Sequence, residues 1–134
     1  MKKNILIIDD DEEICEELSE IMRAEGYRVE TVSDGLAARS LIEKKTYHLL
    51  ILDLKIPTVT GIELLEFIAK KKLTSKVLVV TARPMGKKEL IQPNDIFAPD
   101  AVEQRLLKSA HGIVKKPFDI AALLVRIAQL LKTA

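Results

Sequence analysis

The sequence predicts an α/β domain in which a doubly wound, five-stranded parallel sheet carries helices on both faces. Short runs of aliphatic residues alternate along the chain with segments whose apolar residues recur at helical spacing. Residues 5–8 and 49–52 are apolar at every position, which is typical of strands buried on both faces. Because a helical segment separates each pair of successive strands, the strands are expected to run parallel.

The predicted elements follow one another in regular order. The strands are expected at residues 4–9, 28–32, 49–53, 77–81 and 112–115. The helices are expected at 12–25, from a cap at Ser33 or Asp34, from about 62 to 71, at 101–109, and after a cap at Asp119. Asp11 suits the start of the first helix, and Gly26 suits its C-terminal stop.

One long connection interrupts this regular order. Residues 83–99 contain three prolines and Gly86, a density that breaks a long helix. We therefore expect a single domain over residues 1–134, with an irregular insertion at about 83–99 between the fourth strand and the fourth helix.

Composition and charge exclude several classes of function. The chain has 134 residues with 21 basic and 20 acidic side chains, so its net charge is +1 and offers no footprint for nucleic acid or an anionic membrane. The only cysteine, Cys15, allows no intrachain disulfide and no cysteine-based metal site. With no bilayer-spanning apolar stretch and no leader before the first strand, the expected location is the cytoplasm.

Polar residues stand where the predicted strands end. Asp9 and Asp10 follow the first strand, Asp53 the third, Thr81 ends the fourth and Lys116 follows the fifth. The carboxyl ends of parallel strands meet at one sheet edge, where open α/β sheets hold ligands. The carboxylates would repel one another there, so a cation or a phosphoryl group is expected among them.

Each of these residues suits a step of phosphoryl chemistry. Asp10 and Asp53 suit Mg²⁺ or Mn²⁺ as direct ligands, with Asp9 acting through water. An aspartate can also attack phosphorus, giving an aspartyl phosphate. Lys116 would offset the remaining negative charge, and Thr81 can donate a hydrogen bond to a phosphoryl oxygen.

Over its whole length the sequence resembles the receiver domains of two-component response regulators. Four motifs in the same order carry the resemblance: Asp9-Asp10, the run from Asp53 through Pro57 to Gly61, Thr81-Ala82, and Lys116-Pro117-Phe118. The resemblance implies the flavodoxin-like strand order 2-1-3-4-5. It also implies that Asp53 is the phosphoacceptor, with Asp10 a direct and Asp9 an indirect metal ligand.

The resemblance implies further roles and partners. The backbone carbonyl of Lys55 is expected to bind the metal, and Thr81, Ala82 and Lys116 are expected to bind the phosphoryl group. The Lys116-Pro117 bond is expected to be cis, and Gly61 is expected to serve backbone geometry. A sensor histidine kinase or a histidine phosphotransfer protein would supply the phosphoryl group, and an unidentified downstream protein would read it. The expected state is a monomer or a phosphorylation-dependent dimer.

The sequence departs from the family pattern at two places. Ile113 occupies the fifth-strand position where the family commonly has an aromatic residue coupled to the threonine as a switch. The irregular segment 83–99 replaces much of the usual output face. In addition, Lys55 and Arg83 flank the phosphoryl site, so slow self-dephosphorylation is expected.

Three functions fit these residues. The leading one is a phosphoryl-accepting switch that has no steady enzymatic turnover. A phosphatase with an aspartate nucleophile would carry a second aspartate two residues after Asp53 as general acid, but that position is Lys55. The third is a degenerate receiver that docks partners independently of phosphorylation. His48 and His111 lie beside strands without matching ligand partners, so a structural role is expected for both.

Overall fold

The computed structural model describes residues 2–82 and 101–132. The strands are β1 (Asn4–Ile8), β2 (Arg28–Val32), β3 (Leu49–Leu52), β4 (Lys76–Thr81) and β5 (Gly112–Lys115). The helices are α1 (Glu12–Ala24), α2 (Gly35–Lys44), α3 (Gly61–Lys70), α4 (Ala101–Lys108) and α5 (Ile120–Lys132). Each strand boundary lies within one residue of its prediction. The insertion expected at 83–99 lies outside the described residues.

The five strands form one parallel sheet in the order β2-β1-β3-β4-β5. This confirms both the predicted fold class and the strand order. Ile8, the last residue of β1, pairs in register with Leu52, the last residue of β3. The residues that follow these two strands therefore emerge beside each other at the same edge of the sheet.

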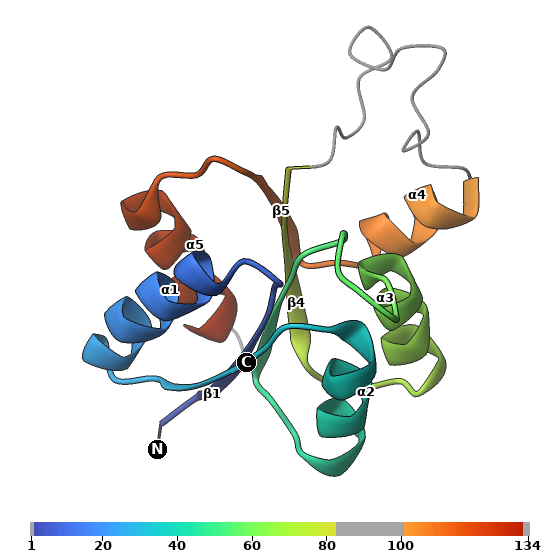
Figure 1. Ribbon diagram of the computed structural model, residues 1–134, viewed down its shortest axis with the longest axis horizontal. Helices are drawn as coiled ribbons and strands as arrows, with labels where there is room; N and C mark the ends of the chain where they lie inside the picture. Colours follow the sequence, from blue (N-terminus) through green and yellow to red (C-terminus); the bar gives the residue numbers. More distant parts are fainter. Residues whose placement is uncertain (1, 83–100, 133–134) are drawn as a thin grey trace, which may run out of the picture.

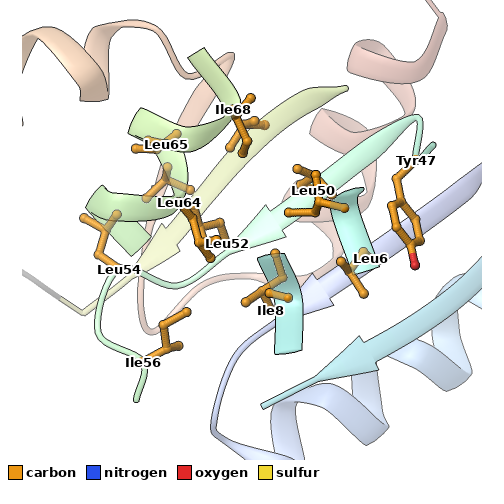
Figure 2. Close-up of a cluster of buried hydrophobic side chains, with 14 of the residues drawn as sticks. Leu6, Ile8, Tyr47, Leu50, Leu52, Leu54, Ile56, Leu64, Leu65 and Ile68 are labelled. Atoms are coloured by element: carbon orange, nitrogen blue, oxygen red, sulfur yellow. The ribbon is translucent and has the colours of Figure 1, made fainter. Parts of the chain in front are cut away.

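Helices cover both faces of the sheet, with α1 and α5 on one side and α2, α3 and α4 on the other (Figure 1). Alternate strand residues point to opposite faces, and each set joins its own buried cluster. Leu6 and Ile8 belong to the buried cluster that includes the apolar residues of α2 and α3 (Figure 2), whereas Ile5 and Ile7 belong to the cluster that includes residues of α1 and α5. The continuous apolar runs in β1 and β3 are thus explained by burial on both sides.

Local polar contacts set the helix ends. The carboxylate of Asp11 caps α1, accepting hydrogen bonds from the backbone amides of Glu13 and Ile14. Of the two caps considered for α2, Asp34 is the one used, and it accepts from the amide of Ala37 at 2.8 Å. Gly26 follows α1 with a φ of 99°, a conformation that glycine adopts at little cost.

Both histidines extend the sheet at its amino-terminal edge. The backbone amide of His48 donates to the carbonyl of Asn4 at 2.8 Å, and its ring Nδ1 accepts from the amide of Asn4 at 2.9 Å. His111 forms the same reciprocal pair with Val77, at 2.8 and 3.0 Å. Each ring therefore acts as an additional rung between neighbouring strands.

Among the helices that the structure describes, none has the length and apolarity that a bilayer crossing requires.

Candidate functional site

Two buried carboxylates lie side by side where β1 and β3 end. The backbone amide of Asp53 donates to the carbonyl of Ile8 at 2.9 Å, and the amide of Asp9 donates to the carbonyl of Val32 at 3.1 Å. These bonds continue the ladders of the sheet one step beyond the strands and so fix both residues. Asp9 is 4% exposed and Asp53 is 7% exposed. Carboxylates buried this deeply need partners that balance their charge.

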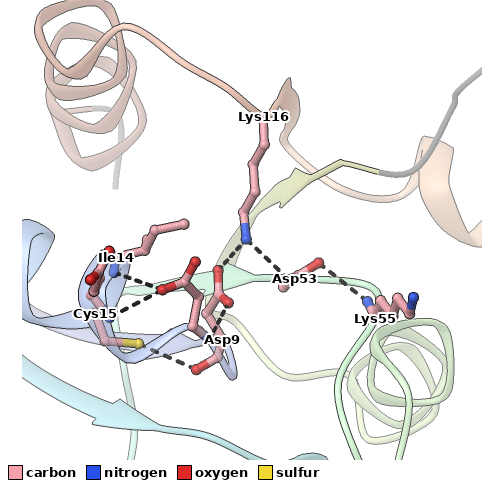
Figure 3. A network of polar contacts seen from close by, with 8 residues as sticks. Asp9, Ile14, Cys15, Asp53, Lys55 and Lys116 are labelled. Atoms are coloured by element: carbon pink, nitrogen blue, oxygen red, sulfur yellow. Dashed lines mark hydrogen bonds and ion pairs between the residues drawn. The ribbon is translucent and has the colours of Figure 1, made fainter.

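Lys116, which follows the edge strand β5, supplies the positive charge that balances these carboxylates. Its Nζ lies 2.7 Å from Oδ2 of Asp9 and 3.1 Å from Oδ2 of Asp53, so one ammonium group contacts both acids (Figure 3). The backbone amide of Lys116 donates to the carbonyl of Thr81 at 2.9 Å, which holds the start of the side chain at the end of β4. The Lys116-Pro117 bond is cis, the conformation that the resemblance implies.

The second oxygen of each buried carboxylate accepts a backbone hydrogen bond. Oδ1 of Asp9 accepts from the amide of Asp11 at 2.9 Å, and Oδ1 of Asp53 accepts from the amide of Lys55 at 3.2 Å. Both carboxylates are thereby oriented before any ligand binds. The contact from the amide of Lys55 was not predicted, because it depends on how the loop turns after β3.

Asp10 completes a cluster of three acids. Asp9, Asp10 and Asp53 each offer a carboxylate oxygen, and these oxygens lie within 4.8 Å of one another. Asp10 is exposed, so the cluster opens to solvent on one side. Hard divalent cations prefer oxygen donors, often combining one or two carboxylates with waters. The three predicted carboxylate ligands therefore form a donor set that fits Mg²⁺ or Mn²⁺.

Burial and charge act in opposite directions on the site. Burial raises the pKa of Asp9 above its usual value and outweighs the lowering effect of its hydrogen bonds from Lys116 and the Asp11 amide. Burial alone would lower the pKa of Lys116, but its hydrogen bonds and attraction to Asp9 and Asp53 prevail and raise that pKa. Lys116 is therefore held as a cation beside the two acids.

Cys15 contacts the backbone of Asp9 and has no assigned part in the chemistry of the site. Its Sγ donates to the backbone carbonyl of Asp9 at 3.3 Å (Figure 3). Burial, together with the charge of Asp9, raises the pKa of the thiol to about 11, so it stays protonated at neutral pH. Cys15 therefore packs as a small buried residue of α1.

The other predicted site residues surround this centre. Thr81 is buried at the end of β4, and Ala82 follows it at the exposed rim. The Lys55 residue is exposed two positions after Asp53. Gly61 begins α3 where a Cβ would lie 2.5 Å from Cα of Leu54, so the close approach of α3 to the loop after Asp53 requires glycine. Ile113 lies on β5, 43% exposed.

A clamp between α2 and the loop after β3 was not predicted from the sequence. Thr58 has a φ of 69°, and its Oγ1 accepts from the backbone amide of Leu36 at 2.9 Å. The amide of Gly35 donates to the carbonyl of Pro57, also at 2.9 Å. A threonine in the left-handed region is uncommon. The sequence signal that could have indicated it is its position directly after Pro57 in a turn.

A parallel sheet of this order, with three clustered aspartates and a lysine at its carboxyl edge, defines a receiver-type site. The sequence model described as the response regulator receiver domain matches residues 5–94, and the chain belongs to this family. Response regulator ArlR of Staphylococcus epidermidis is 31% identical over 129 residues, which are 96% of this chain and 52% of that protein. Regulatory protein VanRB of Enterococcus faecalis is 34% identical over 133 residues, 98% of this chain and 54% of that protein.

The chain thus spans about half the length of these curated relatives. Solved structures agree with the assignment. A CheY-like response regulator receiver domain protein from Methanospirillum hungatei JF-1 superposes with a TM-score of 0.80 at 28% identity, covering 99% of this chain and 96% of that one. The response regulator TrrA of Thermotoga maritima, solved in complex with Mg²⁺-BeF, gives a TM-score of 0.73 at 29% identity, covering 97% and 99%.

Proposed function

We propose that this receiver domain accepts a phosphoryl group on Asp53 in a Mg²⁺-dependent reaction and acts as a signalling switch. One observation carries the proposal: the ammonium group of Lys116 lies 2.7 Å from Asp9 and 3.1 Å from Asp53, at the open edge of the sheet. This arrangement holds a nucleophilic carboxylate next to a cation that can neutralise an incoming phosphate.

The residues of the chain have separate tasks in the proposed reaction. An oxygen of the Asp53 carboxylate attacks phosphorus, a P–O bond forms, and the bond between phosphorus and the donor's imidazole nitrogen breaks. The Lys55 amide and the Lys116 ammonium hold the carboxylate oriented for this attack. Thr81 ends the neighbouring strand β4 and Ala82 follows it, and both are assigned to the phosphoryl oxygens.

The acidic cluster is assigned to the metal ion. Asp10 and Asp53 would be its direct carboxylate ligands, Asp9 would act through water, and the carbonyl of Lys55 would complete the protein's contribution. When bound, a divalent cation neutralises the charge that develops on the phosphoryl oxygens. The donor set supports this assignment because its three carboxylate oxygens lie within 4.8 Å of one another.

The proposed partners are a sensor histidine kinase or a histidine phosphotransfer protein, and a downstream protein that reads the phosphorylated state. We assign no steady enzymatic turnover to the chain. The position two residues after Asp53 is Lys55, so no general acid is offered there for repeated hydrolysis. The ammonium group of Lys55 also favours slow loss of the phosphoryl group, because it can pair with that group or shield it from water.

A second candidate function is docking that does not depend on phosphorylation. Ile113 favours it, because an aliphatic side chain stands on β5 where the family commonly has a switching aromatic. In that case the acidic site would persist without a conformational readout, and partners would bind the unphosphorylated chain equally well.

Intact mass after incubation with acetyl phosphate distinguishes these functions. With Mg²⁺, we expect one added phosphoryl group that persists for minutes or longer in the wild type and is absent from Asp53→Asn. Chelation of divalent ions with EDTA should prevent the addition. No addition under any condition would favour the docking function, steady release of phosphate would indicate a hydrolase, and a lifetime of seconds would contradict slow dephosphorylation.

A further inference from the structure

The loop after β3 carries one of the proposed metal ligands and continues to the first turn of α2. Asp53 begins this loop, and its backbone amide donates to the carbonyl of Ile8 in the sheet at 2.9 Å. Two residues further on, the backbone carbonyl of Lys55 is assigned to the metal ion. The position of that carbonyl therefore depends on what fixes the loop beyond Lys55.

The amino-terminal end of α2 binds the far part of this loop. The first amides of a helix have no partners within the helix, and in α2 the loop provides partners for two of them. The amide of Gly35 donates to the carbonyl of Pro57 at 2.9 Å. The amide of Leu36 donates to Oγ1 of Thr58, also at 2.9 Å. The same hydroxyl lies 2.7 Å from the carbonyl of Pro57 and 3.3 Å from Oδ1 of the cap residue Asp34, either of which can accept its proton.

Backbone packing makes this clamp tight. Gly35 is buried, and a Cβ on it would lie 1.6 Å from the carbonyl oxygen of Val59, where an ordinary contact is 3.4 Å or more. Any larger residue must therefore displace either the helix or the loop. The helix is held to the core by Ala38 and Ile42, which are both buried. The loop is thus the part that would move.

The clamp acts on the loop and not directly on the ion. The cap residue Asp34 is outside the group of described acids that lie close enough together to hold one ion. Gly35 and Thr58 carry no charge, so replacing them with other neutral residues leaves the attraction of the acidic cluster for a cation unchanged. Any effect of these two residues on metal binding must pass through the position of the loop.

We propose that Gly35 and Thr58 are positioning residues for the metal site, because the clamp holds the backbone of Lys55 where its carbonyl can bind the ion. A ligand that is ordered before binding loses less conformational entropy when the ion arrives, so the clamp raises the affinity for Mg²⁺. This inference rests on the Mg²⁺-dependent function proposed above.

The test measures two quantities by NMR on the ¹⁵N-labelled full chain: the affinity for Mg²⁺, and the hydrogen exchange of the Lys55 amide without metal. Gly35→Ala should weaken Mg²⁺ binding about tenfold, because the new Cβ displaces the loop. The matched control is Gly26→Ala, where φ is 99° and no atom lies within 4 Å of the new Cβ. This control should be less stable than the wild type through backbone strain, but its Mg²⁺ affinity should stay within about twofold.

Thr58→Val removes the hydroxyl and keeps both the neutral charge and the β-branched shape. It should weaken Mg²⁺ binding about threefold, since the loop is no longer held by the amide of Leu36. Exchange of the Lys55 amide, which donates to Asp53, should become about threefold faster in the metal-free chain. Thr58→Ser keeps the hydroxyl and should restore both quantities to their wild-type values.

The outcomes separate this inference from the proposed function. Wild-type Mg²⁺ affinity in either clamp variant would overturn the inference, as would equal weakening by Gly26→Ala. If Gly35→Ala does not fold, the comparison of Thr58→Val with Thr58→Ser decides. A wild type that binds no Mg²⁺ would refute the proposed function as well, whereas a wild type that binds Mg²⁺ no better than the clamp variants would refute the role of the clamp alone.

Discussion

Replacement of Lys116 by methionine tests how the two buried acids are held together. The change removes the ammonium group that contacts Asp9 and Asp53 but keeps most of the apolar side chain. The carboxylate oxygens of the cluster lie within 4.8 Å of one another, and two unit charges at that distance repel by about 3.5 kcal/mol at an effective dielectric constant of about 20. Because both residues are almost fully buried, water screens this repulsion weakly.

We expect Lys116→Met to lower the free energy of unfolding by about 2–3 kcal/mol at pH 8, measured by urea denaturation followed by circular dichroism. Burial already raises the pKa of Asp9, and loss of the ammonium would raise it further. The folded state then binds a proton at a higher pH than the unfolded chain does. As the pH falls, protonation relieves the repulsion, so the gap between variant and wild type should narrow toward pH 5.

Lys115→Met is the matched control, because Lys115 is the exposed last residue of β5 and directly precedes Lys116. It should unfold within about 0.5 kcal/mol of the wild type. Millimolar Mg²⁺ should stabilise Lys116→Met more than the wild type, since the cation would replace the missing positive charge. If Lys116→Met were as stable as Lys115→Met at pH 8, the reasoning about the buried carboxylates would be refuted.

Three further variants test other features. Partial burial and the charge of Lys76 lower the pKa of His111, so the contribution of this residue to stability is present above pH 6.5 and is lost as the pH falls. His111→Asn keeps a hydrogen-bond acceptor that cannot titrate, so the urea midpoint of the variant should change less between pH 7 and 5 than that of the wild type. Parallel pH profiles of the two proteins would contradict this. Thr58→Asn should raise the free energy of unfolding by about 0.5–1 kcal/mol, because asparagine tolerates a φ of 69°. A lower thermal midpoint would mean that the threonine hydroxyl outweighs the backbone strain. Gly61→Ala should lower the free energy of unfolding by about 1–3 kcal/mol, because the new Cβ would lie 2.5 Å from Cα of Leu54. The variant should also shift the NMR signal of the Asp53 amide. An unchanged free energy of unfolding would show that the loop after β3 moves freely to accept the Cβ.

The parts of the fold that repeat along the chain were predictable from the sequence. Apolar runs and helical spacing located every strand to within one residue. In the two central strands, burial on both faces of the sheet leaves residues 5–8 and 49–52 apolar at every position. The strand ends then brought Asp9, Asp53 and Lys116 to one edge. Their proximity follows from parallel strand order, and the distances from Lys116 to both acids show how close that edge brings them.

The contacts that were missed depend on the course of loops. The amide of Lys55 donates to Asp53 because the backbone turns sharply after β3. Further along the same loop, Thr58 accepts from the amide of Leu36 and so joins the loop to the start of α2. A β-branched residue with positive φ goes against local preference, so no local rule predicts it. The reciprocal bonding of His48 and His111 was missed for a related reason, since it joins each ring to a strand far away in the sequence.

The position of Ile113 limits how the phosphoryl group that we propose on Asp53 could change the structure of β5. In the register of β4 and β5, Ile113 pairs with Val79, and Thr81 pairs with Lys115. Ile113 has no ring that could move toward Thr81, and it already stands 43% exposed beside a cavity of about 330 Å³ that Phe118 also lines.

Lys116 links the acidic site to the end of β5. Its ammonium group contacts Asp9 and Asp53, and its backbone amide bonds to the carbonyl of Thr81. New negative charge on Asp53 would draw this ammonium group away from Asp9 and pull on the start of the loop that leads to α5. We therefore expect the signal to leave the site through Lys116 and the Pro117 turn, with the side chain of Ile113 equally exposed in both states.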